Sequence, residues 1–285
     1  MHVDELAIDE PLVRRLIGEQ FPEWSRLPLR RVEPQGTDNA IFRLGGELSV
    51  RLALRRGPTG PGGKEADWLP RLAPLLPCEI PVPVAQGRPG AGYPWFWEIH
   101  TWVEGDMLPV EALDPVQAAR DLAAVVRALQ QVDPAGAPPG RGIPLARRDE
   151  EFRSWLPSFT GDPAVAGEWE RALAAPVWEG PPVWHHGDLD GRNWLVRDGR
   201  ITGVIDWGAM GVGDPACDVM VAWKLHSSVA RDAFRDALPT DDATWERARG
   251  WAVSQAVAAL AYYTPENNPA LYHEAEAWLR LVMSE

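Results

Sequence analysis

Cysteine, long apolar runs and positive charge are all scarce in this chain of 285 residues. The two cysteines, Cys78 and Cys217, lie far apart and outside any C-x-x-C pair, so neither a disulfide framework nor a cysteine-based zinc site is expected. No apolar run approaches the roughly 20 residues that a membrane span requires. Acidic residues interrupt the apolar positions of the N-terminal segment, which argues against a signal peptide. We therefore expect a cytoplasmic protein without a membrane partner.

Basic residues number 28 against 41 acidic ones, which gives a net charge of −13. This balance argues against a nucleic-acid partner. An acidic surface can attract cationic ligands, although ordinary solubility explains the same excess. The hydrophobic fraction of 45% is enough for a sizeable core, and the length fits one large domain or two lobes. Nothing in the sequence predicts the oligomeric state.

The N-terminal third predicts a small, mainly antiparallel sheet. A helix is expected over 9–21, where Asp9 can cap the first turn and Pro11 suits it. A second helix over 64–76 contains two prolines and must be short or kinked. Short alternating segments predict strands over 29–34, 40–44, 48–54, 80–86 and 95–103.

From residue 110 onward the pattern is mainly helical. The helix expected over 114–133 is amphipathic, with Asp114 as its N-cap. A hairpin with strands over 194–197 and 201–205 interrupts the helices and turns at Asp198-Gly199. The sequence therefore predicts an α+β protein of two lobes, 1–103 and 104–285. Further helices are expected over 148–157, 163–174, 215–226, 227–237, 241–264 and 269–283.

The stretch HHGDLDGRNWLVRDGRITGVIDWG (185–208) concentrates the polar chemistry. A hairpin brings the start of one strand beside the end of the next, so Asp188, Asn193 and Asp206 are expected to converge at the open end of the hairpin. Two oxygen ligands and a free carboxylate suit Mg²⁺ ions that also hold substrate phosphates. Phosphoryl transfer needs such charge neutralisation and a base that orients the attacking hydroxyl. The alternative is ordinary turn chemistry, since Asp and Asn are common in loops.

Three spaced motifs carry a resemblance to a known family. H-x-D-x-x-x-x-N over 186–193, followed by D-x-G over 206–208, is the catalytic-loop and metal-loop pair of protein-kinase-like enzymes. With Gly213-Asp214-Pro215-Ala216-Cys217-Asp218 downstream, the chain resembles the aminoglycoside phosphotransferase family of small-molecule kinases. Weaker matches extend it over residues 30–225. The resemblance implies a protein-kinase-like fold, with a β-rich nucleotide-binding lobe that carries one helix and a helical lobe for catalysis and acceptor binding.

The resemblance assigns roles within the polar stretch. Asp188 would accept or orient the proton of the acceptor hydroxyl, and Asn193 and Asp206 would hold Mg²⁺ against the nucleotide phosphates. Asp218 would hydrogen-bond the backbone of the catalytic loop. The adjacent histidines are not expected to bind metal, because neighbouring side chains of an extended segment point in different directions; His186 is expected to support the loop through hydrogen bonds.

The resemblance also assigns a nucleotide site in the first lobe. Arg51 stands where most kinases have the strand lysine that grips the α- and β-phosphates, and Glu65 would be its partner on the helix. A guanidinium binds phosphate with different geometry from an ammonium. The alternative is a solvated surface pair. Backbone amides near Gly36 and the hydroxyl of Thr37 would lie near the phosphates, although no G-x-G-x-x-G sequence is present.

The hinge segment 98–103, including Trp102 and Val103, would bind the base through backbone groups, which leaves ATP or GTP open as the nucleotide. The acceptor would be an aminoglycoside or a related antibiotic, and an acidic protein suits a polycationic acceptor. Alternatives are a metabolite kinase for a sugar, choline-like or amino-alcohol acceptor, and a pseudokinase that only binds. A protein substrate is not expected, because no A-P-E sequence follows the metal loop. Candidate acceptor contacts are Asp241, Asp242, Glu246, Glu266, Glu274 and Glu276.

Overall fold

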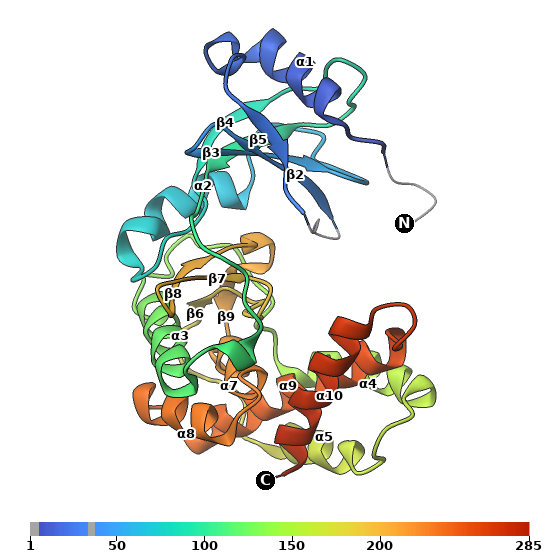
Figure 1. The fold of residues 1–285 in the computed structure, drawn as a ribbon. Coiled ribbons are helices and arrows are strands. Elements are labelled where there is room, and N and C mark those ends of the chain that lie inside the picture. The colour runs from blue at the N-terminus through green and yellow to red at the C-terminus, as the bar shows by residue number, and fades with distance from the viewer. Residues whose placement is uncertain (1–5, 34–37, 285) are drawn as a thin grey trace. The chain divides into compact units, whose positions relative to one another are not determined.

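The computed structural model describes residues 6–33 and 38–284 (Figure 1). The chain divides into two compact units. The first comprises Met1–Pro74 and Glu79–Glu104, and the second comprises Leu75–Cys78 and Gly105–Glu285. Within the described ranges, no helix combines the length and apolar character that crossing a membrane requires.

The first unit is built on a five-stranded antiparallel sheet in the order β1-β2-β3-β5-β4. Strands β2 and β3 form a hairpin in which Gly45 has a φ of +65°, a conformation that favours glycine. In β3 the buried residues alternate with partly exposed ones, which places Arg51 on the more open face. The strand bounds are β1 Leu29–Arg31, β2 Asn39–Leu44, β3 Leu48–Ala53, β4 Pro83–Gly87 and β5 Trp97–Thr101.

Helix α1 (Glu10–Gln20) covers part of this sheet. The Asp9 side chain accepts a hydrogen bond from the Leu12 backbone N–H at 2.8 Å, as the sequence predicted for an N-cap. The buried face of α1 joins Phe42, Val50 and Ile99 of the sheet in one apolar core. Burial of this shared core is what holds the helix on the sheet.

Helix α2 (Lys64–Leu72) is shorter than the predicted 64–76. Pro70 lies inside the helix, and a single 3-10 turn, Ala73–Leu75, follows the last residue. Pro74 has no N–H to continue the α-helical hydrogen bonds, which explains the early end.

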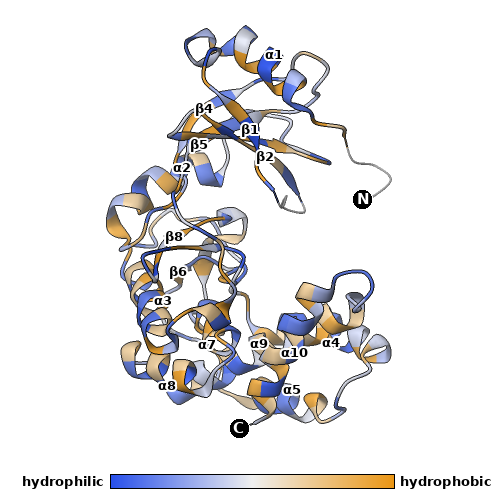
Figure 2. Ribbon diagram, viewed as in Figure 1, coloured by the Kyte–Doolittle hydropathy of each residue, from blue (hydrophilic) through white to orange (hydrophobic). Residues whose placement is uncertain are grey.

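The second unit is mainly helical, with long helices around the centrally packed α9 (Asp242–Tyr262). Helix α9 contacts α10, α5, α6 and α4, and twelve of its residues are buried, so no single face of it is apolar. Helices α3 and α8 pair with each other and show mixed hydrophobic and hydrophilic residues along their length (Figure 2). The remaining long helices are α3 Pro115–Gln130, α4 Asp149–Trp155, α5 Val165–Ala174, α8 Ser228–Ala237 and α10 Pro269–Met283.

Two small antiparallel ribbons lie among these helices. Strands β7 (Trp194–Arg197) and β8 (Arg200–Val204) form the predicted hairpin, with Asp198 and Gly199 both at positive φ in its turn. The second ribbon pairs β6 (Val183–His185) with β9 (Gly211–Gly213), and the sequence patterns did not predict it. Three-residue strands are too short to show an alternating pattern.

The helix predicted over 215–226 is wrong as a single element. The structure has two short helices, α6 (Ala216–Val219) and α7 (Val221–Lys224), separated at Met220. Met220 has a ψ of −19°, which is 3-10 rather than α geometry. The predicted α+β class is confirmed: a β-sheet unit comes first and a helical unit follows.

Candidate active site

The loop that follows β6 carries Asp188, and a glycine sets its path. Gly187 has a φ of +85°, and a Cβ at this position would lie 2.6 Å from the carbonyl oxygen of Ala209. Only glycine satisfies both conditions. The close approach keeps the Asp188 loop against the segment that follows Asp206.

The carboxylate of Asp218, at the start of the paired short helices, holds the same loop. Its two oxygens accept hydrogen bonds from the backbone N–H groups of His186 at 2.7 Å and Gly187 at 2.8 Å. Asp218 is 1% exposed, so these charge-assisted bonds are shielded from water. The predicted contact between Asp218 and the loop backbone is confirmed.

His186 supports the loop from within. Its Nδ1 accepts the backbone N–H of Asp188 at 3.1 Å, and its Nε2 lies 3.0 Å from the carbonyl oxygen of Ile205. This pattern assigns the proton to Nε2. The ring also packs edge-on against the buried Trp207. Both nitrogens are engaged, in agreement with the prediction that His186 supports the loop.

The structure brings Asp188, Asn193 and Asp206 to one end of the β7–β8 hairpin. Asn193 Nδ2 donates to the Asp188 carbonyl oxygen at 2.8 Å and to Asp188 Oδ2 at 3.3 Å. The Asn193 carbonyl oxygen accepts the Ile205 N–H at 2.8 Å, which places Asp206 next in the chain. Asp206 itself is exposed and has a φ of +62°, so the backbone turns sharply at this carboxylate. The backbone at these three positions therefore lies at one end of the hairpin, and the convergence of the three side chains on one ligand stays a prediction.

Asp190, two residues after Asp188 in the same loop, is 1% exposed. It forms ion pairs with Arg192 at 2.8 Å and with the buried Lys224 at 3.4 Å. Burial alone would raise the pKa of Asp190, but the charge of Lys224 and the hydrogen bonds and charge of Arg192 outweigh it and hold the pKa well below its ordinary value. Asp190 is therefore a buried anion that anchors the loop to α7.

A further carboxylate, Glu274 of α10, interacts electrostatically with this cluster. Burial and the charge of Asp190 raise its pKa above the ordinary value, against the opposing charges of Arg192 and Lys224. One of its oxygens is buried and has no hydrogen-bond partner among the described residues. Lys224 also lies over the ring of Trp278, 4.7 Å from the centroid. Charged groups of α7, α10 and the loop that follows Asp188 therefore lie close together.

Three of the other acidic candidates for acceptor contacts interact with neighbouring residues of the protein. Asp241 caps α9 by accepting from the Thr244 backbone at 2.8 Å, and Asp242 pairs with Arg235. Glu276 lies 3.3 Å from His273. Glu274 interacts electrostatically with Asp190 and Arg192, which lie in the loop that follows Asp188.

Sequence reasoning missed Arg141. Its Nη1 donates to Asp188 Oδ1 at 2.6 Å and to the Gly187 carbonyl oxygen at 3.1 Å. Arg141 lies 47 residues before Asp188 in a proline- and glycine-rich loop. No motif or local spacing connects the two residues, and only their contact in the fold reveals the pair.

In the first unit, Arg51 and Glu65 form the predicted ion pair, with Arg51 Nη1 2.7 Å from Glu65 Oε2. With its amide oxygen turned toward Arg51, Asn39 accepts from Nε and Nη2, each at 3.2 Å. Glu98 is the partner of Arg51 in the β3–β5 register. Burial raises the pKa of Glu98, but hydrogen bonding and charge from His100, with the charge of Arg51, hold it below the ordinary value. Carboxylates therefore surround the guanidinium.

Two of the four remaining residues predicted to bind nucleotide lie within the described part of the chain. Gly36 and Thr37 lie outside the described residues. The backbone N–H of Trp102 donates to the Glu47 carbonyl oxygen at 2.7 Å, so only its carbonyl remains for a base. Val103 is 4% exposed. Their role in nucleotide binding stays a prediction.

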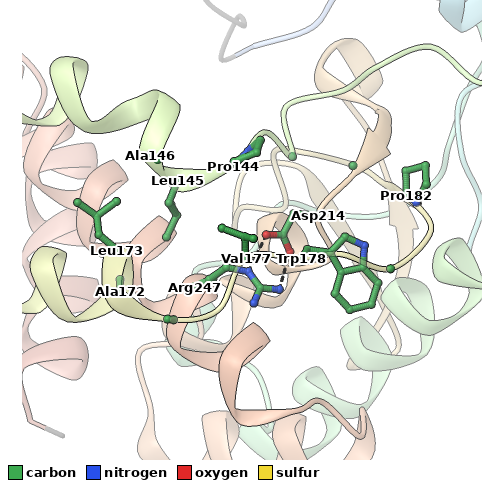
Figure 3. A pocket seen from close by; sticks show the side chains of 14 residues that line it. Pro144, Leu145, Ala146, Ala172, Leu173, Val177, Trp178, Pro182, Asp214 and Arg247 are labelled. Carbon is green, nitrogen blue, oxygen red and sulfur yellow. Dashed lines mark hydrogen bonds and ion pairs between the residues drawn. The ribbon is translucent and has the colours of Figure 1, made fainter.

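The second unit also contains a cavity of about 260 Å³ (Figure 3). Leu145, Leu173, Val177 and Trp178 give it a largely apolar wall. The ion pair of Asp214 with Arg247, at 2.7 Å, forms the polar part of its lining, and both side chains are nearly fully buried. The cavity adjoins Gly142 and Gly213 rather than the three residues that converge at the hairpin.

The sequence matches the phosphotransferase enzyme family over residues 30–251. The chain therefore belongs to this family, and its class is that of a phosphotransferase. Among curated proteins, the uncharacterized protein YcbJ of Bacillus subtilis (strain 168) is 26% identical over 156 residues. That alignment covers 50% of this chain and 47% of YcbJ, so the match spans about half the length of the relative.

Solved structures share the fold over nearly the whole chain. The GDP complex of wild-type aminoglycoside 2′-phosphotransferase-IIIa has a TM-score of 0.72 at 17% identity, covering 97% of this chain and 99% of that one. Macrolide 2′-phosphotransferase MphH from Brachybacterium faecium has a TM-score of 0.64 at 24% identity, covering 95% and 98%. These likenesses confirm the predicted kinase-like fold.

Proposed function

We propose that this protein is a nucleotide- and Mg²⁺-dependent phosphotransferase that phosphorylates a hydroxyl group of an aminoglycoside or a related antibiotic. One observation supports the proposal: Asn193 hydrogen-bonds Asp188, and its carbonyl oxygen accepts the N–H of Ile205, the residue before Asp206, at the same end of the β7–β8 hairpin. A carboxylate beside two further oxygen donors is the arrangement that phosphoryl transfer to a hydroxyl requires.

Asp188 would accept or orient the proton of the acceptor hydroxyl. Hydrogen bonds to His186 and Asn193 and the backbone bonds of Asp218 already define the path of its loop. In phosphoryl transfer most of the barrier is lowered by positioning and charge stabilisation, so a rigid loop around Asp188 suits the role.

Asn193 and Asp206 would hold Mg²⁺. The donor set fits this ion, because Asn193 Oδ1 and the Asp206 carboxylate have no hydrogen-bond or ion-pair partner among the described residues. Proteins typically bind Mg²⁺ through one or two oxygen ligands, and the substrate phosphates supply further ligands. When bound, the ion would neutralise phosphate charge during transfer.

Arg51 would contact the nucleotide phosphates, and Glu65 and Asn39 would hold its guanidinium in place. Gly36, Thr37, Trp102 and Val103 would complete the nucleotide site. The nucleotide would be ATP or GTP: similar folds are described as a GDP complex and as a ternary complex with AMP-PNP and hygromycin B.

The acceptor is a small molecule in this proposal, because proteins with similar folds are described in complex with kanamycin and with gentamicin. A metabolite kinase with a less cationic acceptor is the second candidate. One observation favours it: Asp241 and Asp242 are engaged within the protein, which leaves fewer carboxylates for a polycation.

Nucleotide turnover with a panel of aminoglycosides, macrolides, sugars and amino alcohols tests the proposal. We expect Mg²⁺-dependent phosphorylation of at least one acceptor by the wild-type protein and none above background by Asp188→Ala. The exposed Asp232→Asn is the matched control, since its carboxylate is 68% exposed on α8. Retained phosphorylation by Asp188→Ala would remove Asp188 from the assigned role.

A further inference from the structure

The segment around Arg141 is attached to strand β9 by backbone hydrogen bonds. The Gly140 N–H donates to the Val212 carbonyl oxygen at 3.2 Å, and the Val212 N–H donates to the Pro138 carbonyl oxygen at 2.9 Å. Two residues farther along, the Asp214 N–H donates to the Gly142 carbonyl oxygen at 2.9 Å. A loop without regular secondary structure is thereby held almost like an added strand.

Four glycines permit this close approach, two on the loop and two on β9. A Cβ on Gly140 would lie 2.3 Å from His185 Nε2, and one on Gly211 would lie 2.4 Å from the Gly140 nitrogen. Gly142 and Gly213 also approach each other too closely for a side chain: a Cβ on Gly213 would lie 2.1 Å from the Gly142 carbonyl oxygen. The backbone on either side of Arg141 therefore has little freedom to move.

The guanidinium of Arg141 reaches from this fixed backbone to the catalytic loop. Nη1 binds Asp188 Oδ1 at 2.6 Å and the Gly187 carbonyl oxygen at 3.1 Å. The other Asp188 oxygen, Oδ2, receives Nδ2 of Asn193 at 3.3 Å. The carboxylate is thus held through both oxygens, by residues that lie 47 positions before it and five after it.

Stability alone does not account for the pair. The side chains of Arg141 and Asp188 are 40% and 32% exposed, and ion pairs this accessible contribute only about 0–1 kcal/mol to folding. By contrast, one donor on each oxygen, Arg141 on Oδ1 and Asn193 on Oδ2, restricts rotation of the Asp188 carboxylate about its Cβ–Cγ bond.

We propose that Arg141 is a positioning residue that fixes the orientation of the Asp188 carboxylate toward the acceptor hydroxyl. The proposal rests on the proposed function of Asp188. In that reaction the acceptor oxygen forms a bond to the γ-phosphorus, the bond to the β–γ bridging oxygen breaks, the nucleoside diphosphate leaves and the hydroxyl proton passes to Asp188. Arg141 gains and loses no proton in these steps.

Kinetics of Arg141→Met and Arg141→Lys test the role. We expect kcat of Arg141→Met to fall by about 100-fold, since an error of about 1 Å in a catalytic group has a cost of this size. The KM for nucleotide and the melting temperature are expected to stay unchanged. Arg141→Lys should recover part of the loss, and added guanidinium ion at low millimolar concentration should recover part of it in Arg141→Met. The control is Arg147→Met, an exposed arginine of the same segment.

Two comparisons separate this proposal from the proposed function. If Arg141 acts through Asp188, then adding Arg141→Met to Asp188→Asn lowers any residual rate no further; a further loss equal to that in the wild-type background overturns the proposal. Crystal structures of the wild type and Arg141→Met decide the role even if no acceptor is found. A displaced or disordered Asp188 carboxylate in the variant supports it, and an unchanged carboxylate overturns it. Failure of the wild type on every acceptor counts against the proposed function alone.

Discussion

Asp218 binds the backbone N–H of Gly187 at 2.8 Å across 31 residues of sequence. Its second oxygen binds the N–H of His186 at 2.7 Å. One buried carboxylate thus satisfies two consecutive backbone donors of the loop that carries Asp188. Buried N–H groups need a partner, and the Asp218 carboxylate supplies it for these two donors.

Asp218→Asn is expected to destabilise the protein. The amide can accept one of the two N–H groups, but its own NH₂ faces the other, which leaves a buried donor without a partner. The expected loss in the free energy of unfolding is about 2 kcal/mol, measured by urea denaturation. Asp232→Asn, an exposed position, should change it by less than about 0.5 kcal/mol. An equal effect of the two substitutions would contradict the assigned role of Asp218.

Arg247→Met should lower stability more strongly. Arg247 binds Asp214 through Nε at 2.7 Å and Nη2 at 3.1 Å and the Pro176 carbonyl oxygen through Nη1 at 2.6 Å. Removing one partner leaves the Asp214 charge buried at 5% exposure, which has a cost of about 3–5 kcal/mol. Thermal and chemical denaturation measure the loss. The control is the exposed ion pair of Arg235 with Asp242, because Arg235→Met should lower the free energy of unfolding by less than about 1 kcal/mol.

The effects of substituting Arg247 and Asp214 on the free energy of unfolding should be strongly coupled. The double variant Arg247→Met with Asp214→Asn removes both charges, so we expect it to be more stable than the sum of the two single losses predicts. Additive losses would show that the two charges do not stabilise each other.

Tyr93 should make the protein sensitive to alkaline pH. Burial raises the pKa of its phenol from 10.0 to about 12, and the phenol O–H donates to the Ala53 carbonyl oxygen at 3.1 Å. Between these values the folded protein keeps a proton that the unfolded chain releases. The free energy of unfolding therefore falls as the pH rises through this window, by up to about 1.4 kcal/mol per pH unit from this group.

Tyr93→Phe removes the titrating group and should make this alkaline decline less steep. At pH 7 the variant should lose about 1 kcal/mol with the hydrogen bond. Unfolding curves between about pH 7 and pH 12 measure both effects. Tyr262→Phe is the control, since that ring is 53% exposed, and its alkaline decline should match the wild type. Identical slopes for Tyr93→Phe and the wild type would exclude Tyr93 as the source.

Asp206→Asn should raise the Mg²⁺ requirement of the proposed reaction. The substitution removes one anionic oxygen from the donor set, so the Mg²⁺ concentration at half-maximal rate should rise by about tenfold or more. A titration of rate against Mg²⁺ measures the shift. Asp198→Asn at the opposite end of the same hairpin is the control, because Asn also tolerates its φ of +53°. An unchanged Mg²⁺ dependence in Asp206→Asn would show that Asp206 is not a Mg²⁺ ligand.

Local signals made much of this molecule predictable. The Asp198-Gly199 turn predicts the β7–β8 hairpin, and the hairpin brings Asn193 and Asp206 together because the start of one strand lies beside the end of the next. The N-caps at Asp9 and Asp114 are likewise visible in the sequence, since a cap depends on residues three positions apart. The general order of strands and helices follows from the same short-range patterns.

Contacts across long stretches of chain could be found only in the folded structure. Arg141 reaches Asp188 over 47 residues, and Lys224 reaches Asp190 over 34, with no periodicity to indicate either pair. The β6–β9 ribbon joins segments too short to have a pattern, and the glycines that admit the Arg141 loop gain their meaning only from the backbone beside them. Hydrophobic periodicity and turn chemistry act between near neighbours in sequence, whereas the surroundings of the Asp188 carboxylate depend on which distant segments pack together.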